Sequence, residues 1–235
     1  MTEDNGLMAR QIALEVEATD LGIDRYRELR AADESKLPPG MRLLRKAVQP
    51  TADAISAFIE EYKSGKPGRN AGLIQYLTQF SPEVAAYVTA KCMVRSIAKP
   101  QAVQTTAMTI TGILEDTLNY AELKAEAPVL YKRLMNKIKS SSNPGYRHIV
   151  MRRQQKYAGI KVIKWGMSER LRLGMQLLKF MEHATGLFAI EWEQKGRIRT
   201  QQFLVPTPET LEWLEQSHRN CELLSPFYLP MVVPP

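Results

Sequence analysis

The sequence predicts a mainly α-helical fold, an irregular multi-helix domain with one β-hairpin near its C-terminal end. Two observations support this prediction. In most segments between residues 7 and 184, apolar residues recur three and four positions apart among charged ones, which is the spacing of amphipathic helices. After Gly186 they gather in two short runs rich in Phe, Ile, Trp and Val, which is typical of strands. With 44% hydrophobic residues, the 235-residue chain can form a sizeable core.

Two helices are expected at the start of the chain. The first covers residues 7–30, where the apolar side chains fall mostly on one helical stripe. Pro38 and Pro39 then interrupt the pattern. The second helix covers residues 41–62, and Pro50 within it is expected to kink or split it.

The segment 63–70 has no helical pattern. It contains two Gly, one Pro and three cations, so we expect an exposed loop. A short helix follows at 73–80. Ser81 then begins a longer helix that runs to residue 97, because Ser is a favourable N-cap and Pro82 suits the first helical position.

Further helices are expected at 100–124, 128–139, 146–157, 168–184 and 207–220. A mobile linker is expected at 140–145, and Gly186 is a typical left-handed helix stop. The two runs 187–193 and 198–205 flank a short segment with one glycine and predict the β-hairpin. The proline-rich segment 225–235 is expected to be extended.

Positive charge is concentrated in one region of the chain. Residues 132–172 contain twelve Lys and Arg against a single acid, Glu169, which gives a local net charge of +11. Since the whole chain carries +7, the remainder carries −4. Such a region attracts polyanions, and the phosphate backbone of nucleic acid is the usual partner. A solvated helix face rich in Lys and Arg is the alternative interpretation.

The sequence contains no catalytic motif that we can identify. The three histidines are far apart, and no phosphate-binding glycine loop or nucleophile motif occurs. The adjacent acids Glu60–Glu61 and Glu115–Asp116 are expected to be exposed to solvent. Cys92 lies in an apolar helix and is expected to be an inert core thiol. We therefore predict neither catalytic residues nor a metal or cofactor site in this chain.

Cellular location can also be predicted from composition. Two cysteines exclude a disulfide scaffold, and no apolar run approaches 18 residues. The first residues, MTEDNG, are those of neither a secretory signal nor a transit peptide. A cytoplasmic protein without a membrane span is expected.

Several segments, in order along the chain, carry a resemblance to a known family. They are 11–17 (QIALEVE), 25–27 (RYR), 81–91 (SPEVAAYVTAK), 103–116 (VQ…ILED) and 225–235 (SPFYLPMVVPP). Together they resemble the N-terminal domain of the phage-type single-subunit DNA-directed RNA polymerases. The resemblance extends over nearly the whole chain and is weakest across 125–165. The acidic start favours a bacteriophage enzyme over a mitochondrial precursor.

The resemblance implies a domain organisation and a set of partners. Residues 1–224 would form a helical promoter-binding domain, and 225–235 would lead to a polymerase core that this chain lacks. The chain would be a truncated polymerase or one subunit of a split one. It would bind upstream promoter DNA, help to melt it, hold the upstream edge of the bubble and meet the nascent RNA. The complete enzyme would join nucleotides with magnesium, and would act in the host cytoplasm.

In the family, one loop lies against the A·T-rich upstream minor groove, and the segment 63–70 falls at its position. Narrow A·T-rich minor grooves are strongly negative and favour inserted cations. Lys63, Lys66 and Arg69 would supply them, and Asn70 would add a donor and an acceptor for base edges. An ordinary cationic turn is the alternative.

The family also has a β-hairpin that wedges into the duplex at the upstream edge of the melted bubble, and residues 187–205 fall at its position. A wedge needs an apolar tip that replaces lost base stacking, with cations for the phosphates. Ile198 is the candidate wedge. The other tip residues implied to bind DNA are Lys195, Gly196, Arg197 and Arg199. In the alternative interpretation, Ile198 packs inward in a surface hairpin.

Two functions from other classes remain open. One is a stand-alone helical nucleic-acid-binding regulator without a polymerase core. The other is a structural or assembly subunit whose basic face meets an acidic protein.

Overall fold

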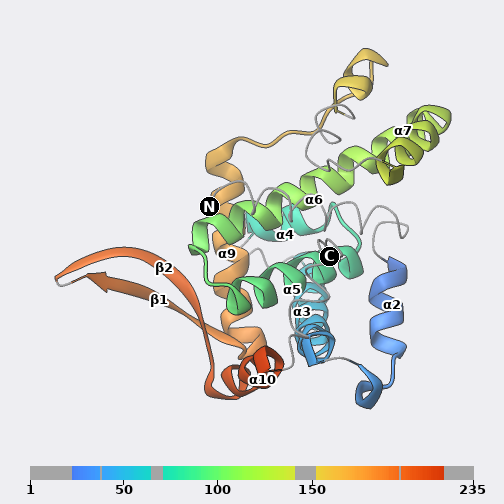
Figure 1. Cartoon of the computed structure of the whole chain (residues 1–235). Helices are drawn as coiled ribbons and strands as arrows, with labels where there is room; N and C mark the ends of the chain where they lie inside the picture. The colour runs from blue at the N-terminus through green and yellow to red at the C-terminus, as the bar shows by residue number, and fades with distance from the viewer. Residues whose placement is uncertain (1–22, 38, 65–70, 141–151, 196, 220–235) are drawn as a thin grey trace, which may run out of the picture.

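The computed structural model describes residues 23–37, 39–64, 71–140, 152–195 and 197–219 (Figure 1). Within these residues, the fold is mainly helical with one two-stranded antiparallel hairpin near the C-terminal end, as the sequence predicts. The predicted segments 7–22, 141–151 and 220–235 lie outside the described residues.

The helices keep the order that the periodicity predicts. They are α2 (Ile23–Ala31), a 3-10 turn η1 (Glu34–Lys36), α3 (Pro39–Lys63), α4 (Ala71–Leu77), α5 (Pro82–Ala98), α6 (Val103–Glu126), α7 (Pro128–Ser140), α9 (Met167–Thr185) and α10 (Pro208–Arg219). Residues 152–157 are also helical. The hairpin consists of β1 (Phe188–Lys195) and β2 (Ile198–Pro206).

Local chemistry explains two of the helix boundaries. The Ser81 hydroxyl accepts a hydrogen bond from the Val84 amide at 3.2 Å, which caps α5 as predicted. Gly186 ends α9 in the left-handed conformation, with φ of 62°. Pro50 lies inside α3 without splitting it.

The start of α6 differs from the prediction. The helix begins at Val103 instead of Pro100. Ala102 forms an isolated antiparallel bridge with Phe203 of the hairpin, so the backbone before Val103 is extended. A contact with a residue a hundred positions away therefore sets this boundary.

Helix α5 lies at the centre of the helical body. All of its residues from Val84 to Ile97 are buried, and it packs against α2, α3 and α6 (Figure 1). Cys92 is 2% exposed, which confirms the predicted core thiol. Burial raises the pKa of its thiol to about 12, so the sulfur stays protonated and unreactive at neutral pH.

Helices α6 and α9 cross at very short distance. A Cβ atom built on Gly174 of α9 would lie 2.5 Å from the carbonyl oxygen of Ala107 on α6. Both residues are buried, and the nearest atoms of Ala107 belong to its backbone. Only glycine permits this approach, because backbone atoms cannot rotate away as a side chain can.

We predict that Gly174→Ala lowers the free energy of unfolding by about 1–3 kcal/mol, because α6 and α9 must separate. The loss should appear even though alanine favours a helix over glycine by about 1 kcal/mol. Urea denaturation followed by circular dichroism measures it. Gly166→Ala is the matched control, since a Cβ there meets no atom within 4 Å. Equal stability of the two variants would contradict the prediction.

Candidate nucleic-acid interface

The hairpin projects from one side of the helical body, away from α2 and α7 (Figure 1). Its base is fixed in the core, where Phe188 and Leu204 are each 2% exposed. The Ile190 amide donates to Glu182 of α9 at 2.6 Å, which ties β1 to that helix. The remainder of the hairpin extends beyond these anchors.

The register of the strands assigns residues to two faces. Ile190 pairs with Leu204, and Glu191 pairs with Phe203. Because successive side chains of a strand alternate, Ile190 and Leu204 face the core, whereas Glu191 and Phe203 face the opposite side. Trp192 follows on the core-facing side, beyond the body, and is 45% exposed.

The tip carries the candidate wedge. Lys195 pairs with Ile198, so two residues, Gly196 and Arg197, connect the strands. Ile198 is 69% exposed and Arg197 is also exposed, which excludes the alternative that Ile198 packs inward. Gly196 and the side chains of Lys195 and Arg199 lie outside the described residues.

A β-bulge separates the base of the hairpin from its tip. Trp192 pairs with Gln202, whereas Gln194 pairs with Arg199, so one residue of β1 faces two residues of β2. The Thr200 hydroxyl lies 2.8 Å from the Glu193 carboxylate, to which it donates, and 3.3 Å from the Glu193 carbonyl oxygen. The bulge is therefore held by a side-chain hydrogen bond.

The second predicted DNA element is described only at its start. Lys63 ends α3 and forms an exposed ion pair with Glu60 at 2.7 Å. Lys66, Arg69 and Asn70 lie outside the described residues, so their role stays a prediction.

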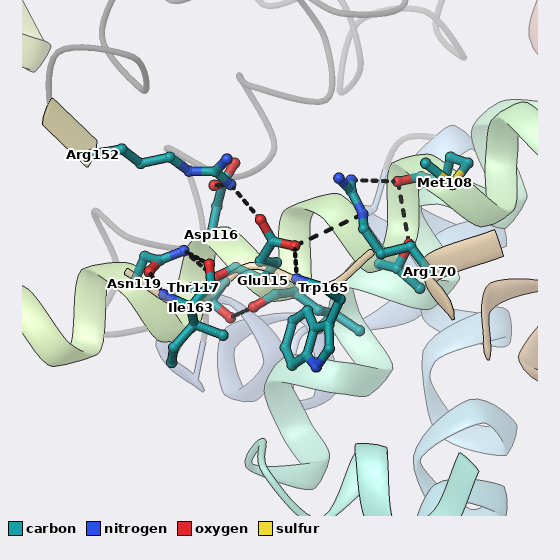
Figure 2. A network of polar contacts seen from close by, with 11 residues as sticks. Met108, Glu115, Asp116, Thr117, Asn119, Arg152, Ile163, Trp165 and Arg170 are labelled. Carbon is teal, nitrogen blue, oxygen red and sulfur yellow. Dashed lines mark hydrogen bonds and ion pairs between the residues drawn. The ribbon is translucent and has the colours of Figure 1, made fainter. Parts of the chain in front are cut away.

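The basic region contains a buried polar network that the sequence analysis missed (Figure 2). Glu115 of α6 is fully buried, which contradicts the prediction that it is exposed. Its carboxylate pairs with Arg152 at 2.9 Å, lies 3.9 Å from Arg170, and accepts the Trp165 amide at 3.1 Å. The neighbouring Asp116 has a side chain only 15% exposed and also pairs with Arg152. By contrast, Glu60 and Glu61 are exposed as predicted.

The network fastens an extended segment, residues 160–166, along α6. Asn119 donates to the Ile163 carbonyl at 2.8 Å and accepts from the Ile163 amide at 2.7 Å, as a neighbouring strand would. The Trp165 ring packs edge-on against Tyr76 at 5.1 Å between centroids. Polar side chains of α6 thus replace a strand partner for this backbone.

The cations of the basic region divide into two groups. Arg152 and Arg170 are paired internally with Glu115, and Arg172 pairs with Glu169 at 2.7 Å. Within the described residues, the cations that remain exposed outside these pairs are Lys132, Arg133, Arg153, Lys156, Lys161 and Lys164. Tyr157 lies among them and is 77% exposed. The exposed cations of the basic region are thus accompanied by an exposed aromatic ring, and these residues together are called the basic face below.

The described residues contain neither a membrane-spanning helix nor a cluster of metal ligands. Among the described residues, no helix has the length and apolar character needed to cross a membrane. The same residues contain no group of three His, Cys, Asp or Glu side chains that could hold a metal ion.

Comparison with known proteins gives two relatives. No protein-family model matches the chain. It is 22% identical to T7 RNA polymerase of Escherichia phage T7 over 245 residues, which cover 97% of this chain and 28% of that polymerase. It is also 22% identical to the DNA-directed RNA polymerase of Enterobacteria phage T3 over 247 residues, 98% of this chain and 28% of that enzyme.

The resemblance to the phage RNA polymerases is confirmed. The chain spans about 28% of the length of these relatives, which is consistent with the N-terminal domain of a phage-type polymerase.

Three residues of this polymerase-like chain were missed by the sequence analysis. The buried Glu115 stands four positions after Thr111 and four before Asn119, so helical spacing could have indicated a polar stripe facing the protein interior. Glu193 and Thr200 could not have been found in this way, because the bulge that they hold follows from strand register and leaves no composition signal.

We predict that Glu115→Ala lowers the free energy of unfolding by about 2–4 kcal/mol, because Arg170 loses its carboxylate and Arg152 keeps only Asp116. Denaturant titration measures the change. The exposed Glu126 at the end of the same helix provides the control, and its alanine variant should stay within about 0.5 kcal/mol of the unmodified chain. A Glu115→Ala variant as stable as this control would refute the role of the network.

Proposed function

We propose that this chain is the N-terminal portion of a phage-type single-subunit RNA polymerase, which binds upstream promoter DNA, helps to melt it and holds the upstream edge of the bubble. The observation that carries the proposal is the projecting hairpin with an exposed isoleucine at its tip. The similarity to two phage RNA polymerases supports the assignment to an N-terminal portion of such an enzyme.

The wedge role follows from the chemistry of base stacking. Opening a base step costs a few kcal/mol of stacking, and an inserted apolar side chain replaces part of it. Ile198 offers such a side chain, 69% exposed, beside the exposed Arg197, which can meet a phosphate.

The loop 63–70 would hold the upstream duplex. Lys63, Lys66 and Arg69 would enter the negative minor groove of A·T-rich DNA, and Asn70 would reach base edges. In the sequence, Lys63 is the last residue of α3, and α4 begins directly after Asn70.

The exposed basic face would bind nascent RNA. Phosphates would be met by cations such as Lys161 and Lys164, and the exposed Tyr157 would offer a ring on which an unpaired base can stack. Residues 152–157 lie toward α7, on the side of the body away from the hairpin, whereas residues 160–166 return along α6 to α9 (Figure 1).

Nucleotide joining would belong to a polymerase core outside this chain. That core would supply the magnesium site and the catalytic residues, and we expect the 235-residue chain alone to be inactive. For a phage enzyme, the reaction would take place in the host cytoplasm.

We predict that Ile198→Ala weakens the opening of an intact A·T-rich duplex by about 5- to 30-fold, as expected for a loss of one or two kcal/mol. Fluorescence of 2-aminopurine, placed at the expected junction and titrated with the 235-residue chain, measures opening. The variant should bind a pre-melted duplex almost as well as the unmodified chain does. Leu211→Ala, at another exposed aliphatic residue, is the control. An equal loss on both DNAs would refute the wedge.

We also predict that the double variant Lys66→Ala, Arg69→Ala binds A·T-rich duplex more weakly and with a smaller salt dependence. The slope of log K against log salt should decrease in magnitude by about 1.8, since each phosphate contact contributes about 0.9. Fluorescence anisotropy between 50 and 200 mM salt measures the slope. The control removes the same charge at two exposed cations elsewhere, Arg27 and Lys179. An unchanged slope would remove the loop from the DNA interface.

A further inference from the structure

We propose that the β-bulge fixes the direction of the hairpin tip, and that Glu193 and Thr200 are positioning residues for Ile198. The inference rests on the proposed wedge role and extends it to residues that do not touch DNA themselves. It follows from the register of the two strands, the hydrogen bond across the bulge and the geometry of the tip.

Two constraints set the register at the two ends of the hairpin. At the base, burial of Leu204 fixes its pairing with Ile190. At the tip, the two-residue connection fixes the pairing of Lys195 with Ile198. Between these pairs, β1 advances five residues and β2 advances six. The bulge accommodates the additional residue of β2.

Neither constraint requires that additional residue. If β2 were one residue shorter, Leu204 could still face the core and the connection could still contain two residues. The ladder would then be regular, with Thr200 paired to Glu193. A bulge leaves one residue unpaired, bends its strand and increases the local twist. The bend is therefore what the additional residue produces, compared with a hairpin whose β2 is one residue shorter.

The bend is held in place by one side chain. The Thr200 hydroxyl lies 2.8 Å from the Glu193 carboxylate and 3.3 Å from its carbonyl oxygen, which connects the strands where the regular ladder is interrupted. A hydrogen bond to a charged acceptor is stronger than one between neutral groups, although water competes with it at an exposed position such as this one. Here it restricts the bulge to one geometry.

A change at the bulge would be felt at the tip. Thr200 lies two residues from Ile198, a distance of about 7 Å along a strand. For a change of direction of about 25°, a displacement of the tip by roughly 3 Å follows, which is close to the rise of about 3.4 Å between neighbouring base pairs. A change of that size at the bulge would therefore displace Ile198 by about one base step.

Deletion of Gln201 tests the proposal, because it removes the bulge and keeps every tip residue. We expect the deletion variant to melt within a few degrees of the unmodified chain, followed by circular dichroism, and to bind continuous duplex DNA equally well. Its opening of an A·T-rich duplex, followed by 2-aminopurine fluorescence, should decrease about 5-fold or more. Gln202→Ala, next to the bulge, should have neither effect.

A second pair of variants tests the hydrogen bond without changing chain length. Thr200→Val keeps the shape of the side chain and lacks the hydroxyl, so its opening of the duplex should decrease. Thr200→Ser restores the hydroxyl and should recover most of the opening. A structural role alone would instead lower the melting temperature of Thr200→Val and leave opening unchanged at low temperature.

The outcomes separate this inference from the proposed function. If Ile198→Ala impairs opening while the deletion and Thr200→Val do not, the bulge has no positioning role and the wedge stands. If Ile198→Ala has no effect either, both are wrong. If deletion of Gln201 unfolds the chain, the additional residue of β2 is needed for folding, and that part of the argument is refuted. Thr200→Val then decides whether the hydrogen bond positions the tip.

Discussion

The close contact between α6 and α9 is the constraint on which the hairpin and the basic face both depend. Gly174 allows the backbones to meet at Ala107, and the two helices then act as one support. At its N-terminal end, α9 continues from the extended segment 160–166, which α6 holds through Glu115 and Asn119. At its C-terminal end, α9 turns at Gly186 into the hairpin. A displacement of α9 against α6 would therefore move the basic face and the hairpin together.

Folding reduces the number of cations in the basic region that are free of acidic partners. Of the six arginines that contribute to the local net charge of +11, three have acidic partners in the structure. Arg152 and Arg170 pair with the buried carboxylate of Glu115, and Arg172 pairs with Glu169. Their acidic partners make these arginines structural. The charge that would be available to nucleic acid comes from exposed residues of the extended segment, such as Lys161 and Lys164. Sequence charge thus indicates the region but not the residues.

The sequence predicts features that depend on neighbouring residues, and fails where distant ones decide. Ser81 and Gly186 act on their own helix, so both boundaries follow from local chemistry. The start of α6 does not, because Ala102 pairs with Phe203 of the hairpin. Glu115 was wrongly expected at the surface: its helical spacing from Thr111 and Asn119 indicates a polar stripe, but its partner Arg152 lies 37 residues away and cannot be identified from local sequence. For the candidate site, composition identified the hairpin and Ile198, but the register and its bulge required the structure.

The stiffness of the hairpin is the remaining physical requirement for a wedge. A two-stranded ribbon is only marginally stable by itself in water, so its rigidity must come from its ends. Phe188 and Leu204 supply it at the base, through burial in the helical core. Beyond that base, Thr200 and Glu193 make a cross-strand hydrogen bond near the tip. If Ile198 is to displace stacked bases, the hairpin that carries it must not bend away from them. Holding the bulge by a side-chain contact lets the ribbon be bent and rigid at the same place.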